Sequence, residues 1–319
     1  MKKLGLVMVV LIVVVLVTTS VPSAAVADVD KWPEKTIEMI WHSRAGSGGD
    51  LYLRALARFM EGKLGQSIIV NNVTGAAGAN AWNKVARAQP DGYTLLGVSS
   101  TIIASPLQNR IPVNYENFDH VARMFIDAIG FFVRADSPYQ TLADLVEDAR
   151  KRPGEITFGG GTAGNIEFVA AREFMQDAGC EIAIVPFEGG SDGVVSVLGG
   201  HIDAGVGEYA EVAPALESGQ IRMLATFNKI EGTDIPSMAE AGFPNINVEK
   251  LRGLFVPKGT PQPIIDKLVS LMKEAYDDPD FKAFYTANKL VPAFVTGEAF
   301  TELLRKQTEQ VKASLEGQK

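Results

Sequence analysis

The strongest constraint on the fold is an internal duplication, in which a strand, a glycine-rich loop and a helix recur at one constant offset. The first copy runs from an apolar stretch at 37–41 into a loop that ends at Gly49, and the second runs from 156–158 into a loop that ends at Gly164. Chance matches between glycine-rich stretches are the alternative, but the offset persists through the helix, the next strand and the second loop. The further matched pairs are Met60 and Met175, Val70 and Val185, and Gly75 and Gly190. The offset is 115 residues for every pair, and a period of this length indicates a doubled lobe and not a solenoid.

Within each copy, strand-like and helix-like apolar patterns alternate across short connections. Leu51, Ala55 and Phe59 recur every four residues, which is the spacing of one face of a helix. Strands that alternate with helices in this way form parallel sheets with helices on both faces. We therefore predict that each copy is an α/β lobe with a mainly parallel sheet. The expected strands lie near 36–41, 67–71, 93–98, 156–158, 182–186 and 202–206, and the expected helices near 49–63, 79–88, 165–178 and 191–199.

Two short extended stretches resemble each other on either side of the second copy. Gly130-Phe131-Phe132-Val133 precedes it, Gly253-Leu254-Phe255-Val256 follows it, and each leads to a helix start. Thr141 with Asp144 fits a capping box at the first of these helices. The chain is therefore expected to leave lobe 1, build lobe 2 and return, so that two crossings form a hinge. We assign 28–129 and 256–319 to lobe 1, which helices near 262–276 and 297–314 complete, and 130–255 to lobe 2.

The first 27 residues have the layout of a cleaved secretory signal. Met1-Lys2-Lys3 is a basic start, an apolar run follows from Leu4 to Val17, and Ala25-Val26-Ala27 forms an A-x-A exit. The apolar run of about 14 residues is too short to span a bilayer core of about 30 Å. An uncleaved membrane anchor is the alternative. No cysteine lies in this segment to carry a lipid, so we predict a soluble periplasmic protein.

Composition narrows the function classes further. The formal net charge is −8, and an acidic chain is a poor partner for nucleic acid or an anionic lipid surface, which are bound through clustered Lys and Arg. The hydrophobic fraction of 46% and the charged fraction of 21% are those of an ordinary globular protein. Cys180 is the only cysteine, so no intramolecular disulfide can form, and we expect it to pack in the interior instead of acting as a nucleophile.

The glycine loops predict where a ligand would bind. A glycine loop between a parallel strand and a helix presents free backbone N–H groups at the helix N-terminus, which favours an anion. Ligands of open α/β sheets bind beyond the carboxyl ends of the strands, where these loops lie. Facing loops from two lobes would therefore grip a small ligand, and a carboxylate suits an amide-rich pocket. The expected loops are 42–49, 74–78 and 99–101 from lobe 1, and 159–165, 187–191 and 207–209 from lobe 2.

The motifs of common catalytic and cofactor sites are missing from the sequence. It contains no G-x-x-x-x-G-K-[ST], and Gly46-Ser47-Gly48-Gly49 is not a dinucleotide fingerprint. With three histidines, no H-E-x-x-H and no paired cysteines, a zinc site is not expected. Gly189-Gly190-Ser191-Asp192-Gly193 is not a nucleophile elbow. We therefore predict no catalytic residues, no cofactor and no metal.

A family resemblance extends over nearly the whole chain after residue 27. The sequence resembles the extracytoplasmic solute-binding proteins of tripartite tricarboxylate transporters, also called the Bug family. The resemblance implies a two-lobed periplasmic-binding-protein fold, the Venus flytrap. It also implies a monomer that closes on a small organic carboxylate and delivers it to the large and small subunits of a membrane permease. The motifs that carry it are Gly65-Gln66, Ile68-Ile69-Val70-Asn71-Asn72, Gly75-Ala76-Ala77-Gly78, Pro90-Asp91-Gly92-Tyr93-Thr94-Leu95-Leu96, Pro153-Gly154, Val185-Pro186-Phe187-Glu188-Gly189, Leu198-Gly199-Gly200, Ser218-Gly219-Gln220-Ile221-Arg222, Ala239-Glu240-Ala241-Gly242 and Val256-Pro257-Lys258-Gly259-Thr260-Pro261.

Residues of the facing loops are the candidate ligand contacts. Ser100 comes from the loop argument, and the rest come from the resemblance. The full set is Arg44, Ala45, Gly46, Ser47, Gly48, Ala76, Gly78, Ser100, Gly161, Thr162, Ala163, Glu188, Gly189, Glu208 and Tyr209. The first loop departs from the Val-Pro-Phe with a following Gly-Gly that is common in the family, and Gly159-Gly160 stands where a serine is usual. Both departures lie in expected ligand loops, so the ligand can differ from the usual acids.

Several of these side chains allow two interpretations. Arg44 could bind a carboxylate in bidentate fashion, or it could be a solvated or inter-lobe salt-bridged residue. His42 could be a pH-sensitive contact or a hydrogen-bonded structural residue. Glu208 could bind an amine or hydroxyl of the ligand, or could pair with Arg44. Asp50 is expected to cap the helix start.

Three functions fit the sequence to different degrees. A transport receptor for a small carboxylate is the main prediction, and it requires one-to-one binding without turnover. The same binder could serve a membrane sensor kinase, which the sequence does not separate from transport. A periplasmic enzyme is the third alternative, and it would need a nucleophile–base pair or a metal that the motifs do not supply.

Overall fold

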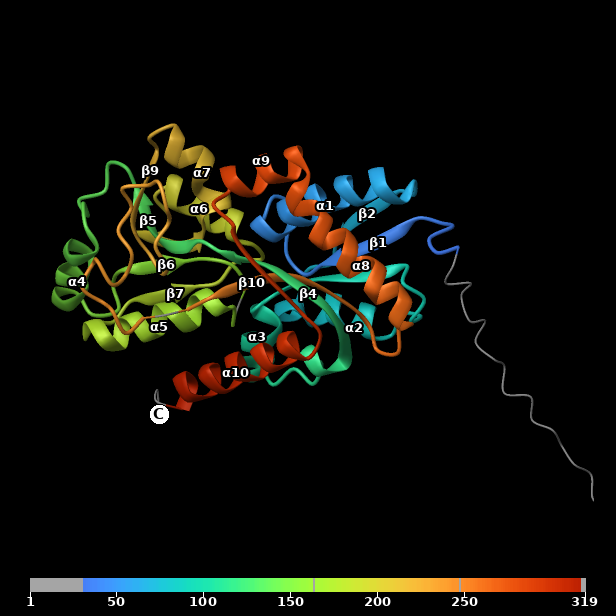
Figure 1. Ribbon diagram of the computed structural model, residues 1–319. Helices are drawn as coiled ribbons and strands as arrows, with labels where there is room; N and C mark the ends of the chain where they lie inside the picture. The colour runs from blue at the N-terminus through green and yellow to red at the C-terminus, as the bar shows by residue number, and fades with distance from the viewer. Residues whose placement is uncertain (1–30, 163, 247, 317–319) are drawn as a thin grey trace, which may run out of the picture.

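Two separate β-sheets, each flanked by helices, form two lobes that lie end to end (Figure 1). The computed structural model describes residues 31–162, 164–246 and 248–316. The expected signal segment at 1–27 and the candidate contact Ala163 lie outside the described residues. Within the described ranges, no helix is both long and apolar enough to cross a membrane.

Lobe 1 is built on a six-stranded sheet in the order β11-β4-β10-β3-β1-β2. Its strands are β1 (Ile37–Trp41), β2 (Ile68–Asn72), β3 (Thr94–Ser99), β4 (Phe118–Asp127), β10 (Lys250–Pro257) and β11 (Val291–Thr296). Its helices are α1 (Gly48–Leu64), α2 (Ala79–Ala86), α3 (Thr101–Asn109), α8 (Gln262–Glu274), α9 (Pro279–Ala287) and α10 (Gly297–Glu316), with short 3-10 turns η1 (Ala76–Gly78), η2 (Tyr115–Asn117) and η3 (Ala275–Asp277).

Lobe 2 is built on a five-stranded sheet in the order β7-β6-β8-β5-β9. Its strands are β5 (Ile129–Arg134), β6 (Thr157–Gly159), β7 (Ala183–Val185), β8 (Ala204–Glu208) and β9 (Ile221–Thr226). Its helices are α4 (Leu142–Lys151), α5 (Ile166–Ala178), α6 (Gly190–Leu198) and α7 (Tyr209–Glu217). The expected elements of both copies are therefore present, and the two-lobed α/β fold is confirmed.

The sheets are mixed, so the prediction of mainly parallel sheets was wrong. The strands of each duplicated unit pair in parallel, as β1 does with β2 and β3, and β6 does with β7 and β8. However, β10 runs antiparallel to both β3 and β4, and β5 runs antiparallel to both β8 and β9. Each of these strands enters its sheet from the crossing between the lobes, which reverses its direction relative to the neighbouring strands.

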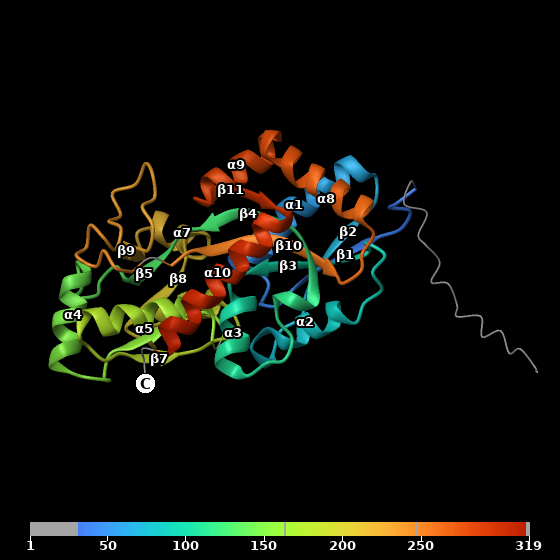
Figure 2. The same cartoon turned by 60° about the horizontal axis from the view of Figure 1, so that its bottom comes forward.

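The second crossing lies earlier in the chain than the sequence indicated. All of β10 pairs within the sheet of lobe 1, beside β4 (Figure 2), so residues 250–255 do not belong to lobe 2 as expected. Close backbone packing explains the glycine there, because a Cβ on Gly253 would overlap the carbonyl of Ala122 on β4. Gly130 on β5 faces the carbonyl of Ala225 in the same way. The chain therefore crosses between the lobes at Ala128, between β4 and β5, and again between β9 and β10.

Local sequence signals account for the ends of several elements. α1 ends at Gly65, whose left-handed backbone (φ 66°) lets its N–H bond to the Glu61 carbonyl. The predicted capping box at α4 is confirmed, because the Thr141 side chain accepts from the backbone N–H of Asp144 and the Asp144 carboxylate accepts from that of Thr141. Cys180 is partly buried against the main hydrophobic core, and burial raises the pKa of its thiol.

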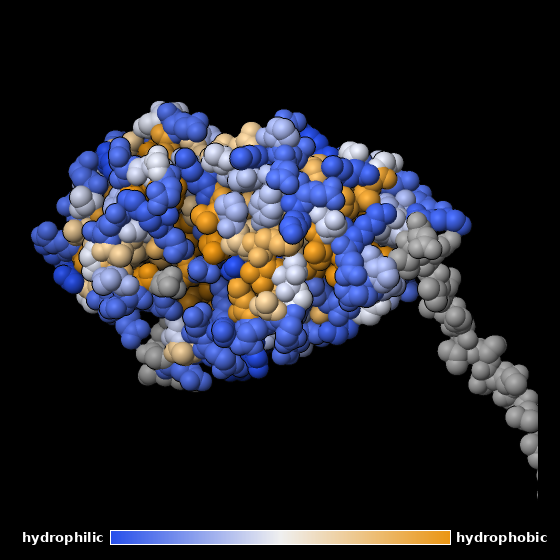
Figure 3. All heavy atoms as spheres, in the orientation of Figure 1, coloured by the Kyte–Doolittle hydropathy of each residue, from blue (hydrophilic) through white to orange (hydrophobic). Residues whose placement is uncertain are grey.

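Apolar side chains fill the space between helices and sheets. In lobe 2, Phe131 lies 5.0 Å from Phe158 and 4.8 Å from Phe174, measured between ring centroids. One face of the molecule is mostly hydrophilic, and hydrophobic atoms gather near its middle (Figure 3). The largest hydrophobic cluster continues from lobe 1 into lobe 2, since it includes Trp82 and Ile102 as well as Phe131 and Phe158.

Candidate ligand site between the lobes

Loops from the two lobes contact one another directly. The Ser43 hydroxyl donates a hydrogen bond to the Glu188 carbonyl at 3.1 Å, and Arg44 Nε lies 3.2 Å from Asp192 Oδ2. On the other side of the junction, Gln108 Nε2 of α3 donates to the carbonyl of Gly164 at 2.8 Å. The first glycine loop of each copy thus faces the opposite lobe, as the duplication predicts.

A cavity of about 430 Å³ lies where these loops meet. Its volume is within the range of small-molecule sites. Among the described residues that line it, Arg44 is the one cation; its side chain is 56% exposed and is paired with Asp192. The cavity is lined by Arg44 and Ala77 of lobe 1 and by Thr162, Pro186, Phe187, Glu188 and Asp192 of lobe 2. Three expected contacts, Arg44, Thr162 and Glu188, are therefore brought together in one space.

The turn η1 holds a strained backbone at the edge of this cavity. Ala76 and Ala77 have φ angles of 50° and 53°, which are uncommon for residues other than glycine. The Ser105 hydroxyl fixes the turn by donating to the Ala77 carbonyl at 2.7 Å. Backbone strain of this kind persists where the surroundings enforce it, and it is concentrated at functional sites. Ala77 lines the cavity in place of the expected Ala76, which is exposed, and Gly78, which is packed against Trp82.

The first turn of α1 points its backbone toward lobe 2. The Gly48 N–H donates to Glu211 Oε1 of α7 at 3.2 Å, and a Cβ on Gly48 would overlap the carboxylate of Glu208. The Ser47 hydroxyl is occupied, because it accepts from Trp41 Nε1 at 2.9 Å. Asp50 stabilises the helix start as expected, by accepting from the backbone N–H of Gly46 at 2.9 Å.

A buried ion network joins the two lobes behind this turn. Lys250 and Arg252 lie two residues apart on β10, so their side chains share one face of the strand. Lys250 pairs with Glu167 of α5 and with Glu208 at the end of β8. Arg252 pairs with Glu208 and, through Nε at 2.6 Å, with Asp127 Oδ2 at the end of β4. All five side chains are at least nine-tenths buried.

This network corrects one expectation and reveals residues that the sequence analysis missed. Glu208 pairs with Lys250 and Arg252 and not with Arg44, whose partner is Asp192. Of the network, only Glu208 was expected at the site. A usable signal was present in the sequence, because Lys250 and Arg252 interrupt an otherwise apolar strand, where unpaired charges would be costly.

The network controls the ionisation of its members. Burial opposes the charged form of Glu208, but Arg252 and Lys250 together lower its pKa to about 2. Burial raises the pKa of Asp127 to about 7, although Arg252 opposes this shift. Burial, and then the negative charge of Glu208, raise the pKa of Glu211 to about 8. Glu211 is thus the carboxyl group that the network stabilises least.

His42 lies beside the network and remains uncharged. Its ring packs between Trp41, at 4.3 Å, and Trp82, at 5.8 Å, measured between centroids. Burial, and then the charges of Lys250 and Arg252, lower its pKa to about 3. This geometry argues against a pH-sensitive contact, since His42 would not change charge near neutral pH, but Nδ1 of His42 has no hydrogen-bond partner among the described residues, as the structural interpretation would require.

Other expected contacts serve mainly structural roles. Ser100 is fully buried, and its hydroxyl accepts from the Leu251 N–H at 3.0 Å and so fixes β10. The N–H of Tyr209 donates to the Ala128 carbonyl at the first crossing, and its ring packs in a core cluster of lobe 2. Gly161 is close to Asn165, and its carbonyl accepts from the Phe187 N–H at 3.0 Å. The remaining candidates lie beside the cavity: Ala45 and Gly46 are exposed, and Gly189 is packed against Ser43 and Arg44.

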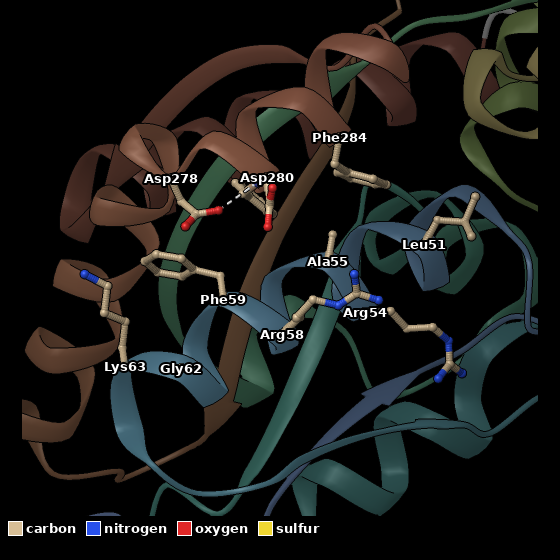
Figure 4. A pocket seen from close by; sticks show the side chains of 11 residues that line it. Leu51, Arg54, Ala55, Arg58, Phe59, Gly62, Lys63, Asp278, Asp280 and Phe284 are labelled. Atoms are coloured by element: carbon tan, nitrogen blue, oxygen red, sulfur yellow. Dashed lines mark hydrogen bonds between the residues drawn. The ribbon is translucent and has the colours of Figure 1, made fainter.

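A second cavity, of about 590 Å³, lies on the outer face of lobe 1 between α1 and α9 (Figure 4). One side carries Arg54, Arg58 and Lys63 of α1, and the other carries Asp280 of α9 and Asp278, the N-cap of that helix. All of its lining comes from lobe 1, so movement of the lobes cannot enclose a ligand there. The described residues contain no cluster of His, Cys, Asp and Glu suited to a metal ion.

The family comparison decides the assignment. A family model described as "Tripartite tricarboxylate transporter family receptor" matches residues 52–317. The chain belongs to this receptor family. Among its relatives, a UPF0065 protein of Bordetella bronchiseptica is 30% identical over 281 residues, which cover 86% of this chain and 82% of that protein.

Solved structures have the same fold as this receptor. The periplasmic binding protein BugD is 25% identical, with a TM-score of 0.82, over 88% of this chain and 96% of that chain. MatC from Rhodopseudomonas palustris, solved with bound malate, is 23% identical, with a TM-score of 0.82, over 89% of this chain and 99% of that chain. The resemblance to Bug-type solute-binding proteins is therefore confirmed.

Proposed function

We propose that this receptor captures a small organic carboxylate between its lobes and delivers it to the permease subunits of a tripartite tricarboxylate-type transporter. The observation that carries the proposal is the cavity lined from both lobes, with Arg44 on one side and Thr162 on the other. It lies close to the starts of α1 and α5, where backbone dipoles favour negative charge. The malate bound by MatC is consistent with a carboxylate ligand.

Opening and closing of the lobes would couple capture to delivery. Contacts such as Ser43 to Glu188 and Arg44 to Asp192 exist only when the loops approach, so a ligand that bridges the same loops favours the closed form. Delivery takes place in the periplasm if the N-terminal signal is processed as its sequence predicts. Catalysis is not part of the proposal.

The test is thermal unfolding of protein that has been refolded from urea, so that ligands carried through purification are removed. Mono-, di- and tricarboxylates are each compared with the corresponding neutral amide. A ligand at 1,000 times its Kd adds about 4 kcal/mol to the free energy of unfolding, which gives a clear shift in Tm. We expect a shift with at least one acid and none with its amide. Equal shifts for an acid and its amide would contradict carboxylate recognition.

Delivery is tested separately, by uptake of the labelled ligand into cells that lack the receptor and into cells in which it is restored. Uptake that does not depend on the receptor would contradict the transport role, even if binding is confirmed.

A further inference from the structure

We propose that Asp192 competes with the ligand for Arg44, because its carboxylate takes the place of a ligand carboxylate when no ligand is bound. The inference rests on the proposed capture of a carboxylate between the lobes, and it names a residue that sets the affinity of that site. It follows from the contacts between the two side chains and from the other charges at the cavity.

Asp192 meets Arg44 as the carboxylate of a ligand would. Both of its oxygens face the guanidinium, with Oδ2 at 3.2 Å from Arg44 Nε and Oδ1 at 3.5 Å from Arg44 Nη1. Arg44 belongs to the first glycine loop of lobe 1, and Asp192 lies in the first turn of α6 in lobe 2. A carboxylate of the protein therefore bridges the lobes at the cavity, and a bound acid would make the same contact with the same cation.

The loops that carry these side chains are held against each other by other contacts. The Ser43 hydroxyl donates to the Glu188 carbonyl at 3.1 Å. Gly189 permits the close approach, because a Cβ there would lie 3.2 Å from the Cβ of Arg44. The Asp192 N–H donates to the Gly189 carbonyl at 3.2 Å, which fixes the turn at the start of α6. Approach of the loops therefore brings the carboxylate to the guanidinium without a ligand.

The charges around the cavity make the two carboxylates rivals. The described lining holds one cation and two acids, which are Arg44, Glu188 and Asp192. Of these two acids, Asp192 is the one that pairs with Arg44. A ligand carboxylate that pairs with Arg44 must therefore displace Asp192 or lie close to a second negative charge, and either lowers the affinity for the ligand.

The pair can exchange partners because it is open to solvent. The side chains of Arg44 and Asp192 are 56% and 29% exposed, and ion pairs at such exposure contribute little stability. After displacement, the Asp192 carboxylate would still lie in the first turn of α6, where the helix dipole favours negative charge. The pair differs in this from the buried network, whose charges would be left uncompensated in the interior.

The test is titration calorimetry of refolded protein with the acids of the carboxylate panel, among them acetate, malate and citrate. Asp192→Asn keeps the shape of the side chain and removes its charge. The control Glu217→Gln makes the same change in net charge on an exposed residue at the far end of α7. We expect Asp192→Asn to bind an acid about two- to fivefold more tightly than wild type, which is the range that exposed ion pairs contribute. Glu217→Gln should bind it with wild-type affinity.

A double-mutant cycle separates competition from simple repulsion. In an Arg44→Ala background the contested cation is gone, so Asp192→Asn should leave the affinity unchanged. An equal gain in both backgrounds would mean that Asp192 only repels the ligand, and would overturn the inference. An affinity that is unchanged or weaker in Asp192→Asn alone would overturn it as well, because Asp192 would then play no part or would hold Arg44 in place for the ligand.

The outcomes distinguish this inference from the proposed function. If an acid binds the wild type and Asp192→Asn brings no gain, the competition is wrong and carboxylate capture stands. Absence of binding by every acid of the panel, in the wild type and in Asp192→Asn, would overturn both.

Discussion

Replacement of Arg252 by methionine tests whether the buried network holds the lobes together. Arg252 is 0% exposed, its Nε lies 2.6 Å from Asp127 Oδ2, and it also pairs with Glu208. Its guanidinium lies 5.1 Å from the centre of the Trp41 ring. The substitution removes the cation and keeps an unbranched side chain of comparable length, so the change in charge should exceed the change in packing.

The expected loss follows from what the substitution leaves behind. Asp127 loses its cation entirely, and Glu208 keeps only Lys250. Removing one partner of a buried ion pair costs about 3–5 kcal/mol, because an uncompensated charge stays buried. We therefore expect Arg252→Met to lower the free energy of unfolding by about 3–5 kcal/mol at pH 7. Lys63→Met, which breaks the exposed pair with Glu274, should cost no more than about 1 kcal/mol.

The assay is urea unfolding followed by tryptophan fluorescence at pH 5 and pH 8. In the wild type the pKa of Asp127 is already raised to about 7, and loss of Arg252 removes the cation that opposes this shift and one of the two cations that lower the pKa of Glu208. Both pKa values therefore rise in the variant, so the folded variant retains protons to a higher pH than the folded wild type does. The stability of the variant therefore falls as the pH rises through this window, and the loss relative to wild type should be smaller at pH 5 than at pH 8. A loss below about 1 kcal/mol, equal at both pH values, would refute the reasoning.

Three further predictions concern the cleft. Arg44→Ala should weaken carboxylate binding by about 1.5–3 kcal/mol, as for a hydrogen bond to a charged group; an unchanged affinity in calorimetry would limit Arg44 to its pair with Asp192. Glu211→Gln should become more stable relative to wild type as the pH rises from 5.5 to 8.5 in thermal unfolding. The reason is that the folded wild type, in which the pKa of Glu211 is raised to about 8, retains a proton that the unfolded chain releases. A difference in Tm between variant and wild type that does not change with pH would contradict this. Gly48→Ala should reduce ligand affinity at least tenfold, because the added methyl group would overlap the Glu208 carboxylate in this arrangement of the lobes. Unchanged affinity together with unchanged X-ray scattering would show that the gap tolerates a methyl group.

Local patterns in the sequence were enough to predict most elements of the fold. The helix expected near 49–63 is α1 at Gly48–Leu64, because apolar periodicity and the glycine that ends the helix both act within a few residues. The direction of β10 was not predictable in this way. Its partners lie far away in the chain, with Leu254 opposite Gly97 on β3 and Ala122 on β4, and strand pairing at such separations leaves no local signal.

The site was only partly predictable for the same reason. Glycine loops indicated where the lobes would meet, and Arg44, Thr162 and Glu188 do line one cavity. The charged interior was missed, because the ion-pair partners of Lys250 and Arg252 are carboxylates on three other elements, far away in the sequence. A charged residue inside an apolar strand indicates that it has a buried ion-pair partner, but it does not identify that partner.

Hydrogen–deuterium exchange measured with and without a bound acid from the carboxylate panel tests the central claim most directly. If the ligand is held between the lobes, backbone amides in the loops at 42–49 and 159–165 gain protection together, because both loops close on it. The outer groove between α1 and α9 should be unchanged. Protection confined to a single lobe, or centred on residues 54–63 and 278–284 at the outer groove, would contradict binding between the lobes.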